Sequence, residues 1–237
     1  MAGQRTVLGN HDAGMVGHPK AIWGVTQGNP IWEEVGEVAG QAGRLFLLNV
    51  TLNRDKAVTG VFAGDLPRAH AAGCAFVKGS AMVAVPRPFD IVVTTNSGYP
   101  LDLNLYQSVK GMRAADQIVR TGGAIIIATS CWDGIPEHGL YGKILRESRD
   151  ARELLDKITA PGFLEQDQWQ AHIQALIQSR AAIYVKSDGL TDDEIRSALL
   201  LPCRRIEDTI SDLLNTYGRK ASICVMPEGP QTIPYIA

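Results

Sequence analysis

Three neighbouring side chains at the start of a predicted helix could together hold a carboxylate. Tyr106, Gln107 and Lys110 follow the apolar stretch FDIVVTT, and residues three and four apart lie on neighbouring ridges of a helix. An amide can donate to a carboxylate, an ammonium attracts it, and a helix N-terminus adds positive potential. A solvent-facing lysine on an ordinary amphipathic helix fits the same spacing, so this alternative stays open.

The place of these residues in the chain favours a binding role. The preceding loop, TNSGYPLD, leaves an apolar strand, and the ligands of open parallel sheets bind outside the carboxyl ends of strands. Within this loop, Gly98 permits a tight turn, Pro100 stops strand pairing, and Asp102 is expected to cap the helix. The loop lacks the G-x-G-x-x-G pattern, so the sequence does not predict a dinucleotide fingerprint.

Residues 86–237 alternate between apolar strands and helical stretches. The pattern predicts strands over 90–95, 123–129, 181–186 and 221–226, and helices over 102–121, 166–179, 191–198 and 204–217, with two more within 138–158. Strands that are apolar throughout suit a sheet covered on both faces, and alternation with helices implies parallel crossovers. We therefore expect an α/β fold, a Rossmann-like three-layer sandwich with a mostly parallel sheet.

Residues 29–85 predict a helix–hairpin–helix subdomain that packs on the α/β core. Asn29 is a candidate N-cap, and Pro30 suits the first helical position. Two β-type runs flank the polar turn NRDK, and Asp65 is a candidate cap for a helix of about four turns. Residues 1–28, which are rich in glycine and histidine, are expected to be an irregular segment between domains of a fuller enzyme.

The composition argues against nucleic acid and membrane as partners. The 237 residues are 45% hydrophobic with a formal net charge of −2, which leaves no basic stripe. No apolar run approaches the roughly 20 residues of a membrane span, and the first residues lack the apolar core of a signal peptide. The four cysteines lie far apart with no C-x-x-C pair, which is typical of free thiols in a reducing compartment. These features predict a cytoplasmic protein.

Several stretches of the chain resemble one known family. The run DIVVTTNSGYPLDLNLYQSVKGMRAAD, followed by GGAIII, closely resembles the C-terminal domain of the nickel-pincer lactate racemase family. GVTQGNP, AVTGVFAGDLPRAHAAGC and DQWQ resemble the family in the same order, so the resemblance covers most of the chain. It implies an isomerase that racemises or epimerises 2-hydroxy acids with a nickel-pincer nucleotide. In that scheme a histidine takes the hydroxyl proton while hydride leaves C2 and returns to it.

The resemblance also implies roles for the residues near position 106. Gln107 and Lys110 match the substrate-carboxylate contacts of the family, and Tyr106 matches the aromatic residue beside them. The loop SCWDGIPEHG, which begins at residue 130, departs from the family pattern. Cys131, Trp132 and His138 in this loop are therefore candidates to set substrate choice, and the substrate need not be lactate itself.

The resemblance implies that two further residues contact the cofactor. Trp169, in DQWQ, matches a family tryptophan near the cofactor, although a core aromatic at a helix start fits equally well. His11, in GNHDAGM, falls where the family places its nickel ligand, and imidazole suits that metal. His18 is a weaker alternative as the metal ligand. The third possibility is that neither histidine binds the metal.

The family keeps its proton-transferring histidines and its cofactor-linked lysine in an N-terminal domain, and the sequence shows no counterpart of them. The resemblance thus implies the C-terminal half of an enzyme, with no confident catalytic residue, which is inactive and without cofactor when isolated. Its expected partners are that N-terminal domain, on the same or a separate chain, and a 2-hydroxy acid, with a homodimer as a further option. The alternative is a non-catalytic Rossmann-like module that binds a small carboxylate or a nucleotide.

Overall fold

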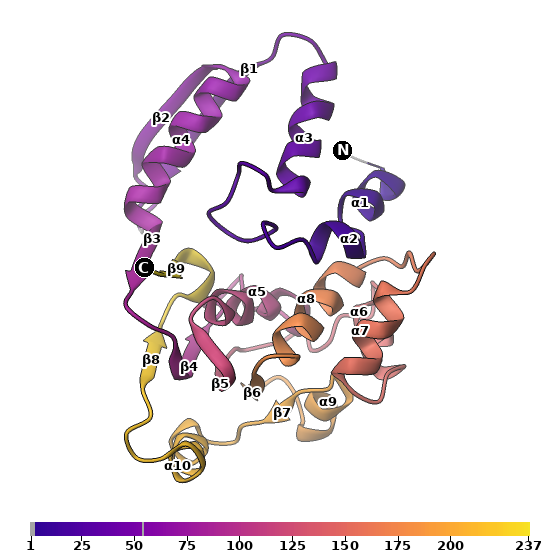
Figure 1. The fold of residues 1–237 in the computed structure, drawn as a ribbon, viewed down its shortest axis with the longest axis vertical. Coiled ribbons are helices and arrows are strands. Elements are labelled where there is room, and N and C mark those ends of the chain that lie inside the picture. The colour runs from indigo at the N-terminus through magenta and orange to yellow at the C-terminus, as the bar shows by residue number, and fades with distance from the viewer. Residues whose placement is uncertain (1–2, 54) are drawn as a thin grey trace. The chain divides into compact units, whose positions relative to one another are not determined.

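The computed structural model describes residues 3–53 and 55–237, which form two compact units (Figure 1). The first unit holds residues 3–17 and 84–237, and the second holds residues 18–83. The subdomain limits expected from the sequence, 28/29 and 85/86, stay a prediction. None of the helices in the described residues is both long and apolar enough to cross a bilayer.

A five-stranded parallel sheet forms the centre of the first unit. Its strand order is β7-β6-β5-β4-β8, and β4 pairs with strands on both sides, through Ile91 with Ala124 of β5 and with Ile223 of β8. The strands are β4 (Phe89–Thr95), β5 (Val119–Ala128), β6 (Ala182–Lys186), β7 (Leu201–Pro202) and β8 (Ile223–Met226).

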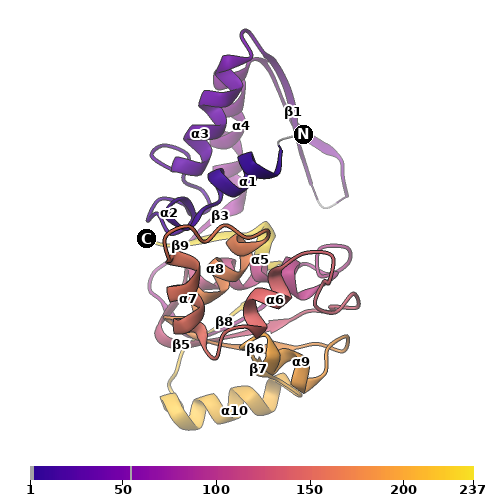
Figure 2. The ribbon, with the colours of Figure 1, turned by 90° about the vertical axis from the view of Figure 1, so that its right-hand side faces the viewer.

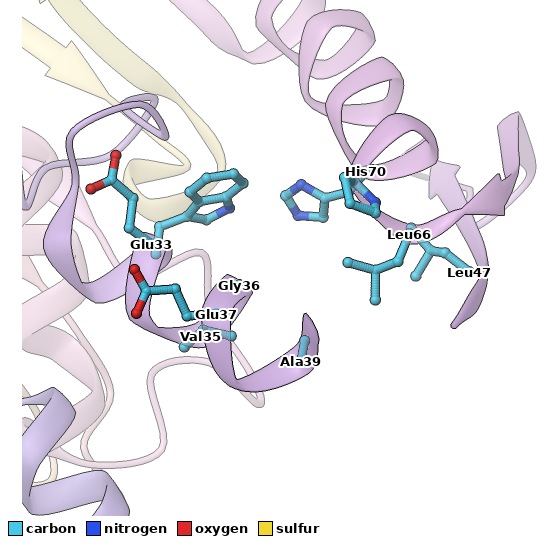
Figure 3. Close-up of a pocket in the computed structure, with 10 residues that line it drawn as sticks. Glu33, Val35, Gly36, Glu37, Ala39, Leu47, Leu66 and His70 are labelled. Atoms are coloured by element: carbon cyan, nitrogen blue, oxygen red, sulfur yellow. The ribbon is translucent and has the colours of Figure 1, made fainter. Parts of the chain in front are cut away.

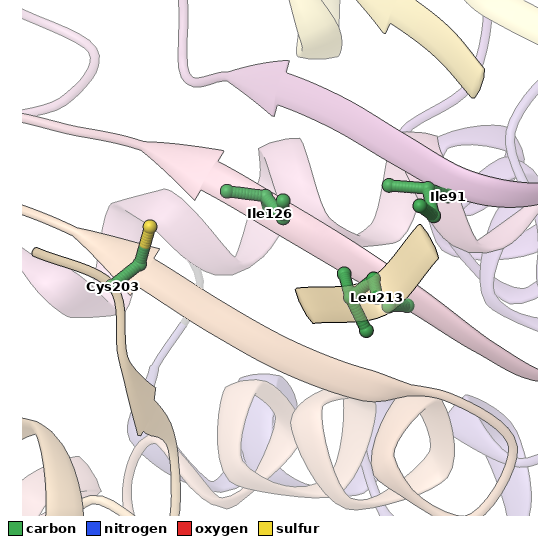
Figure 4. Close-up of a cluster of buried hydrophobic side chains, with 5 residues drawn as sticks. Ile91, Ile126, Cys203 and Leu213 are labelled. Atoms are coloured by element: carbon green, nitrogen blue, oxygen red, sulfur yellow. The ribbon is translucent and has the colours of Figure 1, made fainter. Parts of the chain in front are cut away.

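Helices cover both faces of this sheet (Figure 2). On one face lie α9 (Asp192–Ser197) and α10 (Ile206–Tyr217), and on the other lie α5 (Leu105–Asp116), α6 (Tyr141–Arg146), α7 (Ala151–Thr159) and α8 (Gln168–Gln178). Alternate strand residues point to opposite faces. Ile91 and Ile126 therefore pack with Cys203 and with Leu213 of α10 in one buried cluster (Figure 4). The predicted three-layer α/β sandwich is confirmed.

Helix α5 approaches the sheet closely at Gly111. A Cβ atom at this position would lie 2.5 Å from the backbone oxygen of Thr95 at the end of β4, and 3.0 Å from Ile127 Cδ1 of β5. Because real Cβ atoms do not come so near backbone oxygens, only glycine fits here without a shift of the helix. The glycine thus fixes how tightly the helix that carries Tyr106 and Lys110 sits against the strand before it.

Several expected elements differ from those observed. The predicted helix 102–121 is too long at both ends, because α5 begins only after Asn104 and β5 already begins at Val119. Residues 1–28 were expected to be irregular, yet the described residues among them include α1 (Gln4–Asn10) and α2 (Ala13–Val16). The Asp12 side chain caps α2 by accepting from Met15 N at 2.8 Å. Short elements without a clear pattern were missed: β3 (Met82–Val85), β7 (Leu201–Pro202), β9 (Ile233–Ile236) and the 3-10 turn η1 (Gly229–Gln231).

The second unit contains the expected helix, hairpin and helix. Asn29 caps α3 (Pro30–Gln41) by accepting from Ile31 N, as predicted. The antiparallel pair β1 (Phe46–Leu52) and β2 (Val58–Asp65) forms the hairpin, whose predicted NRDK turn includes one residue outside the described part of the chain. The final helix, α4, spans Leu66–Ala81. Asp65 occupies its N-cap position, but the Asp65 side chain makes no capping hydrogen bond.

Candidate functional site

The start of α5 is set by Asn104 and not by Asp102. The Asn104 side chain accepts from Gln107 N at 3.1 Å, which is the geometry of an N-cap. The expected capping role of Asp102 is therefore wrong. Its carboxylate instead accepts from Ser130 N at 3.0 Å, and its backbone oxygen accepts from Cys131 N at 2.9 Å. Asp102 thus joins the loop after β4 to the loop after β5.

Further polar contacts fix these two loops against α5. Asn104 Nδ2 donates to Asp133 Oδ2 at 3.0 Å, and the Ser108 and Thr129 hydroxyls lie 2.6 Å apart. Cys131 is fully buried beside them, and burial raises the pKa of its thiol. Its expected part in substrate choice therefore cannot come from direct contact, whereas Trp132 is 60% exposed.

Gln107 and Lys110 lie together on the accessible side of α5. Lys110 Nζ donates to Gln107 Oε1 at 2.6 Å. This bond turns the amide oxygen of Gln107 towards the ammonium, so the Gln107 NH₂ group remains a donor for a ligand. The ammonium has three N–H donors and uses one of them here. The pair therefore presents two kinds of donor and one positive charge, which suits a carboxylate.

Tyr106 connects α5 to α8. Its hydroxyl accepts from Trp169 Nε1 at 2.8 Å, and its backbone oxygen accepts from Gln170 Nε2 at 2.9 Å. Burial raises the pKa of the Tyr106 phenol, while the hydrogen bond from Trp169 acts in the opposite direction. The phenol is therefore neutral at pH 7 and keeps its own O–H as a donor. The structure thus brings Trp169 to the same place as the carboxylate-binding candidates.

His11 also lies at this place. Its ring contacts that of Trp169 edge-on, with 5.5 Å between the ring centroids and 62° between the planes. His18, the alternative, belongs to the second unit, where its exposed ring accepts from Lys20 N at 3.2 Å. Tyr106, Trp169 and His11 therefore form one contact chain, with Gln107 and Lys110 on the helix that carries Tyr106.

Asp167 was not found by sequence reasoning, although it stands just before Trp169. It occupies the N-cap position of α8 with a positive φ of 66°, a conformation that is uncommon for a residue with a side chain. Asp167 Oδ2 accepts from Leu140 N at 3.2 Å. Asp167 thereby ties the loop before α6 to the start of α8, the helix that carries Trp169. The only signal for it in the sequence was its place in DQWQ, at the start of the predicted helix 166–179.

His172 is a buried histidine one turn after Trp169. It is 2% exposed, and its Nδ1 has no hydrogen-bond partner among the residues that the structure describes. A Cβ at Gly17, directly after α2, would lie 3.5 Å from His172 Cε1, so the ring packs against the segment that carries His11. Burial lowers the pKa of His172, and the nearby Arg113 lowers it further. The His172 ring therefore packs against the segment at Gly17 as a neutral imidazole.

The lowered pKa of His172 predicts a pH-dependent stability. As the pH falls from 7 to 5, an unfolded histidine with a pKa of about 6.5 binds a proton before the folded one does, so the free energy of unfolding decreases. One such proton changes it by at most about 1.4 kcal/mol per pH unit. Denaturant unfolding at pH 5, 6 and 7 measures this slope, which should be smaller in His172→Gln. The matched control His18→Gln removes an exposed imidazole and should keep the slope. An unchanged slope in His172→Gln would contradict the account.

The donor atoms of this site limit the kind of metal that it can hold. Within residues 3–53 and 55–237 no group of three or more His, Cys, Asp or Glu side chains could hold a metal ion. His11 offers a single imidazole beside Trp169, and imidazole is a suitable ligand for nickel. A donor set of one imidazole does not fit a metal held by this chain alone. It fits a metal whose other ligands come from an organic cofactor.

Comparison with known proteins decides the family. The model of a family described as "Lactate racemase C-terminal domain" matches residues 85–233, which is more than half of the chain. The chain belongs to the lactate racemase family. A lactate racemase from Thermoanaerobacterium thermosaccharolyticum is 34% identical over 235 residues, which cover 98% of this chain and 55% of that protein. A lactate racemase from Lactiplantibacillus plantarum is 34% identical over 232 residues, which cover 97% of this chain and 54% of that protein.

One solved structure agrees with this membership of the lactate racemase family, and a second shares the fold. The lactate racemase apoprotein from T. thermosaccharolyticum matches with a TM-score of 0.90 at 34% identity, over 96% of this chain and 55% of that one. A protein from Thermotoga maritima matches with a TM-score of 0.61 at 14% identity, which shows a shared fold alone. This lactate racemase-like chain spans about half the length of the curated relatives that it matches.

Proposed function

We propose that this chain is the C-terminal, substrate-contacting half of a nickel-pincer-dependent racemase or epimerase of 2-hydroxy acids. The observation that carries the proposal is that the candidate site residues come together at α5. Gln107 and Lys110 present a carboxylate-binding pair on the helix whose Tyr106 holds Trp169, and Trp169 contacts His11. The racemase would be complete only with the N-terminal domain of the family, and the chain alone would be inactive. A cytoplasmic location and a homodimer remain predictions.

The first task of the site would be to hold the substrate by its carboxylate. Every 2-hydroxy acid presents one carboxylate beside the carbon whose configuration changes. Lys110 would supply the opposite charge, and Gln107 Nε2 would donate to one carboxylate oxygen. The bond between Lys110 and Gln107 holds both groups in place before the substrate arrives, which reduces the entropy lost on binding. Two fixed points on the carboxylate restrict the orientations of C2 without favouring either configuration there.

Tyr106 and Trp169 would close the site around the reacting carbon. The Tyr106 hydroxyl accepts from Trp169, and its own proton is free to be donated to a substrate oxygen. The Trp169 ring would cover the bound acid and exclude water, which strengthens the charge interactions at Lys110.

His11 would be the residue of this chain that binds the cofactor. When bound, the nickel-pincer nucleotide would supply hydride acceptance and return at C2. His11 would hold the nickel through one ring nitrogen, and its contact with Trp169 would restrict rotation of the ring. The proton-transferring groups would come from the N-terminal domain.

Reconstitution tests this function. The chain is combined with the N-terminal domain of the T. thermosaccharolyticum lactate racemase carrying its cofactor, and single enantiomers of several 2-hydroxy acids are followed by polarimetry. We expect loss of optical rotation in the mixture and none with either half alone. Calorimetry of the isolated chain with nucleotides and 2-hydroxy acids provides the comparison. Micromolar nucleotide binding without racemisation in the mixture would contradict the proposal and favour a non-catalytic binding module.

A further inference from the structure

Two exposed aromatic side chains contact each other on the loops that follow β4 and β5. Tyr99, in the loop after β4, is 78% exposed, and Trp132, in the loop after β5, is 60% exposed. Their ring centroids lie 6.3 Å apart with 30° between the ring planes, which is within the range of aromatic contacts. Tyr99 and Trp132, here called the aromatic pair, therefore form one apolar surface that the two loops leave open.

The backbone on both sides of Trp132 is fixed to the segment that leads into α5. Cys131 N donates to Asp102 O at 2.9 Å, and Asp133 N donates to Leu103 O at 2.9 Å. The first residue of α5 also donates its N–H to this loop, at 3.0 Å. The Cys131 side chain is fully buried, whereas that of Trp132 is mostly exposed. Trp132 is thus held beside the first turn of the helix that carries the carboxylate-binding candidates.

Tyr99 lies in a tight turn of the loop after β4. Leu101 N and Asp102 N both donate to Gly98 O, at 2.8 and 3.1 Å, and Gly98 has a positive φ of 71°, which glycine adopts without strain. The carboxylate of Asp102 then joins this turn to the loop after β5 by accepting from Ser130 N. One hydrogen-bond network therefore positions both members of the aromatic pair.

The aromatic pair and the carboxylate-binding candidates lie at the same edge of the sheet. Strands β4 and β5 are parallel, so the loops that follow them lie at the carboxyl edge, and α5 runs back from this edge to the start of β5. Lys110 follows Leu105, the first residue of α5, by five positions, which corresponds to about 7.5 Å along the helix axis. Helical side chains lean towards the N-terminus of their helix. A substituent of an acid held at Lys110 can therefore extend towards Trp132.

The two rings determine which kind of substituent fits there. Tyrosine and tryptophan present large apolar faces, and they bind a further ring through offset-stacked or edge-to-face contacts. The single methyl group that lactate carries on C2 is too short to extend from Lys110 to Trp132. An aromatic ring attached through C3 has the length and the flat apolar shape that the aromatic pair can contact.

We propose that the aromatic pair is the subsite for the C2 substituent of the substrate, and that the substrate is a 2-hydroxy acid with an aromatic side chain, such as 3-phenyllactate. The proposal rests on the proposed function, because that function places the carboxylate at Gln107 and Lys110. The acid is then held at both ends, by charge and hydrogen bonds at α5 and by ring contacts at Trp132 and Tyr99.

Substrate preference tests the subsite. The chain is reconstituted with the N-terminal domain of the T. thermosaccharolyticum relative carrying its cofactor, and kcat/KM is measured for one enantiomer of 3-phenyllactate and of lactate. We expect 3-phenyllactate to be preferred at least about tenfold, because apolar pockets discriminate by roughly 10- to 200-fold per methylene group. Trp132→Ala should reduce this preference at least about fivefold. Trp132→Phe, which keeps an aromatic ring, should retain most of it.

Trp32→Ala is the matched control. Trp32 is 41% exposed and belongs to the second unit, where it lines a groove with Glu33 and His70 (Figure 3). Its loss should leave the preference for 3-phenyllactate within about twofold of that of the parent. The preference is a ratio of two kcat/KM values of the same protein, so a variant that only lowers the amount of folded protein does not change it.

The other outcomes separate this subsite from the proposed function. Racemisation of both acids with equal kcat/KM would overturn the subsite and leave the proposed function standing. Equal losses for both acids in Trp132→Ala would assign the aromatic pair to a contact with the N-terminal domain and would also overturn the subsite. If neither acid is racemised, the proposed function fails, and calorimetry of the reconstituted protein decides the subsite. Tighter binding of 3-phenyllactate that depends on Trp132 would support it, and equal binding of the two acids would overturn it.

Discussion

Replacing Lys110 with alanine is expected to lower kcat/KM for a 2-hydroxy acid by roughly 30-fold to several-thousand-fold in the joined protein. The joined protein is one polypeptide in which the N-terminal domain of the T. thermosaccharolyticum relative precedes this chain. Loss of one partner from a desolvated charge pair costs about 2–5 kcal/mol, and about 1.4 kcal/mol corresponds to a factor of ten. Lys110 is exposed in this chain, where an ion pair contributes at most about 1 kcal/mol. The full loss of kcat/KM is therefore expected only in the joined protein, where the N-terminal domain would cover the site. Initial racemisation rates over a range of substrate concentrations measure it.

Two further variants separate the charge of Lys110 from a general effect of substitution. Lys143→Ala removes a lysine of α6 whose side chain is 59% exposed, and it should change kcat/KM less than twofold. Gln107→Glu places a negative charge where the substrate carboxylate is expected, so it should lower kcat/KM at least as much as Lys110→Ala does. Equal activity of the Lys110→Ala protein and the parent would remove Lys110 from the site.

The second large effect is expected at His11. In His11→Ala the joined protein should retain nickel at least about tenfold less well, because loss even of a residue that only supports a metal ligand costs 10- to 100-fold in affinity. Nickel per protein after dialysis, measured by elemental analysis, gives this value without an activity assay. His18→Ala is the matched control from the second unit and should retain nickel like the parent. Equal nickel content in His11→Ala and the parent would exclude His11 as the ligand.

The fold of the first unit could be predicted because its pattern is local and regular. Strands such as β5 are apolar throughout, and helices of ordinary length separate them, so the parallel sheet followed from the order of elements. The ends of α5 could not be fixed in the same way. Asp102 and Asn104 are both suitable caps in sequence, and the choice of Asn104 depends on the loop after β5, which engages Asp102 through Ser130 N.

The candidate site, too, could be predicted from the sequence only in part. The clustering of Gln107 with Lys110 follows from helical spacing and was predicted. The hydrogen bond from Trp169 to Tyr106 joins residues 63 positions apart, and spacing along the chain says nothing of such a pair. The resemblance to the lactate racemase family gave both residues, whereas their contact and the place of His11 beside Trp169 came from the structure.

Which side of the hairpin is covered by α4 could not be predicted from the sequence, for a physical reason. The runs FLLNVTL and VTGVFAGD predict two strands, but the pattern of apolar residues cannot tell a side covered by α4 from a side covered by another domain. Phe62 and Val61 are neighbours of similar character, and only the register of the hairpin assigns one to α4 and the other to the open side.

The central claim, that Lys110 holds the carboxylate of a 2-hydroxy acid, is tested most directly by comparing an acid with its amide. Binding of lactate and of lactamide to the joined protein is measured by calorimetry in the parent and in Lys110→Ala. The account predicts that the parent binds lactate at least about tenfold more tightly than lactamide, and that this preference falls below about twofold in Lys110→Ala. The same preference for lactate in both proteins would contradict it.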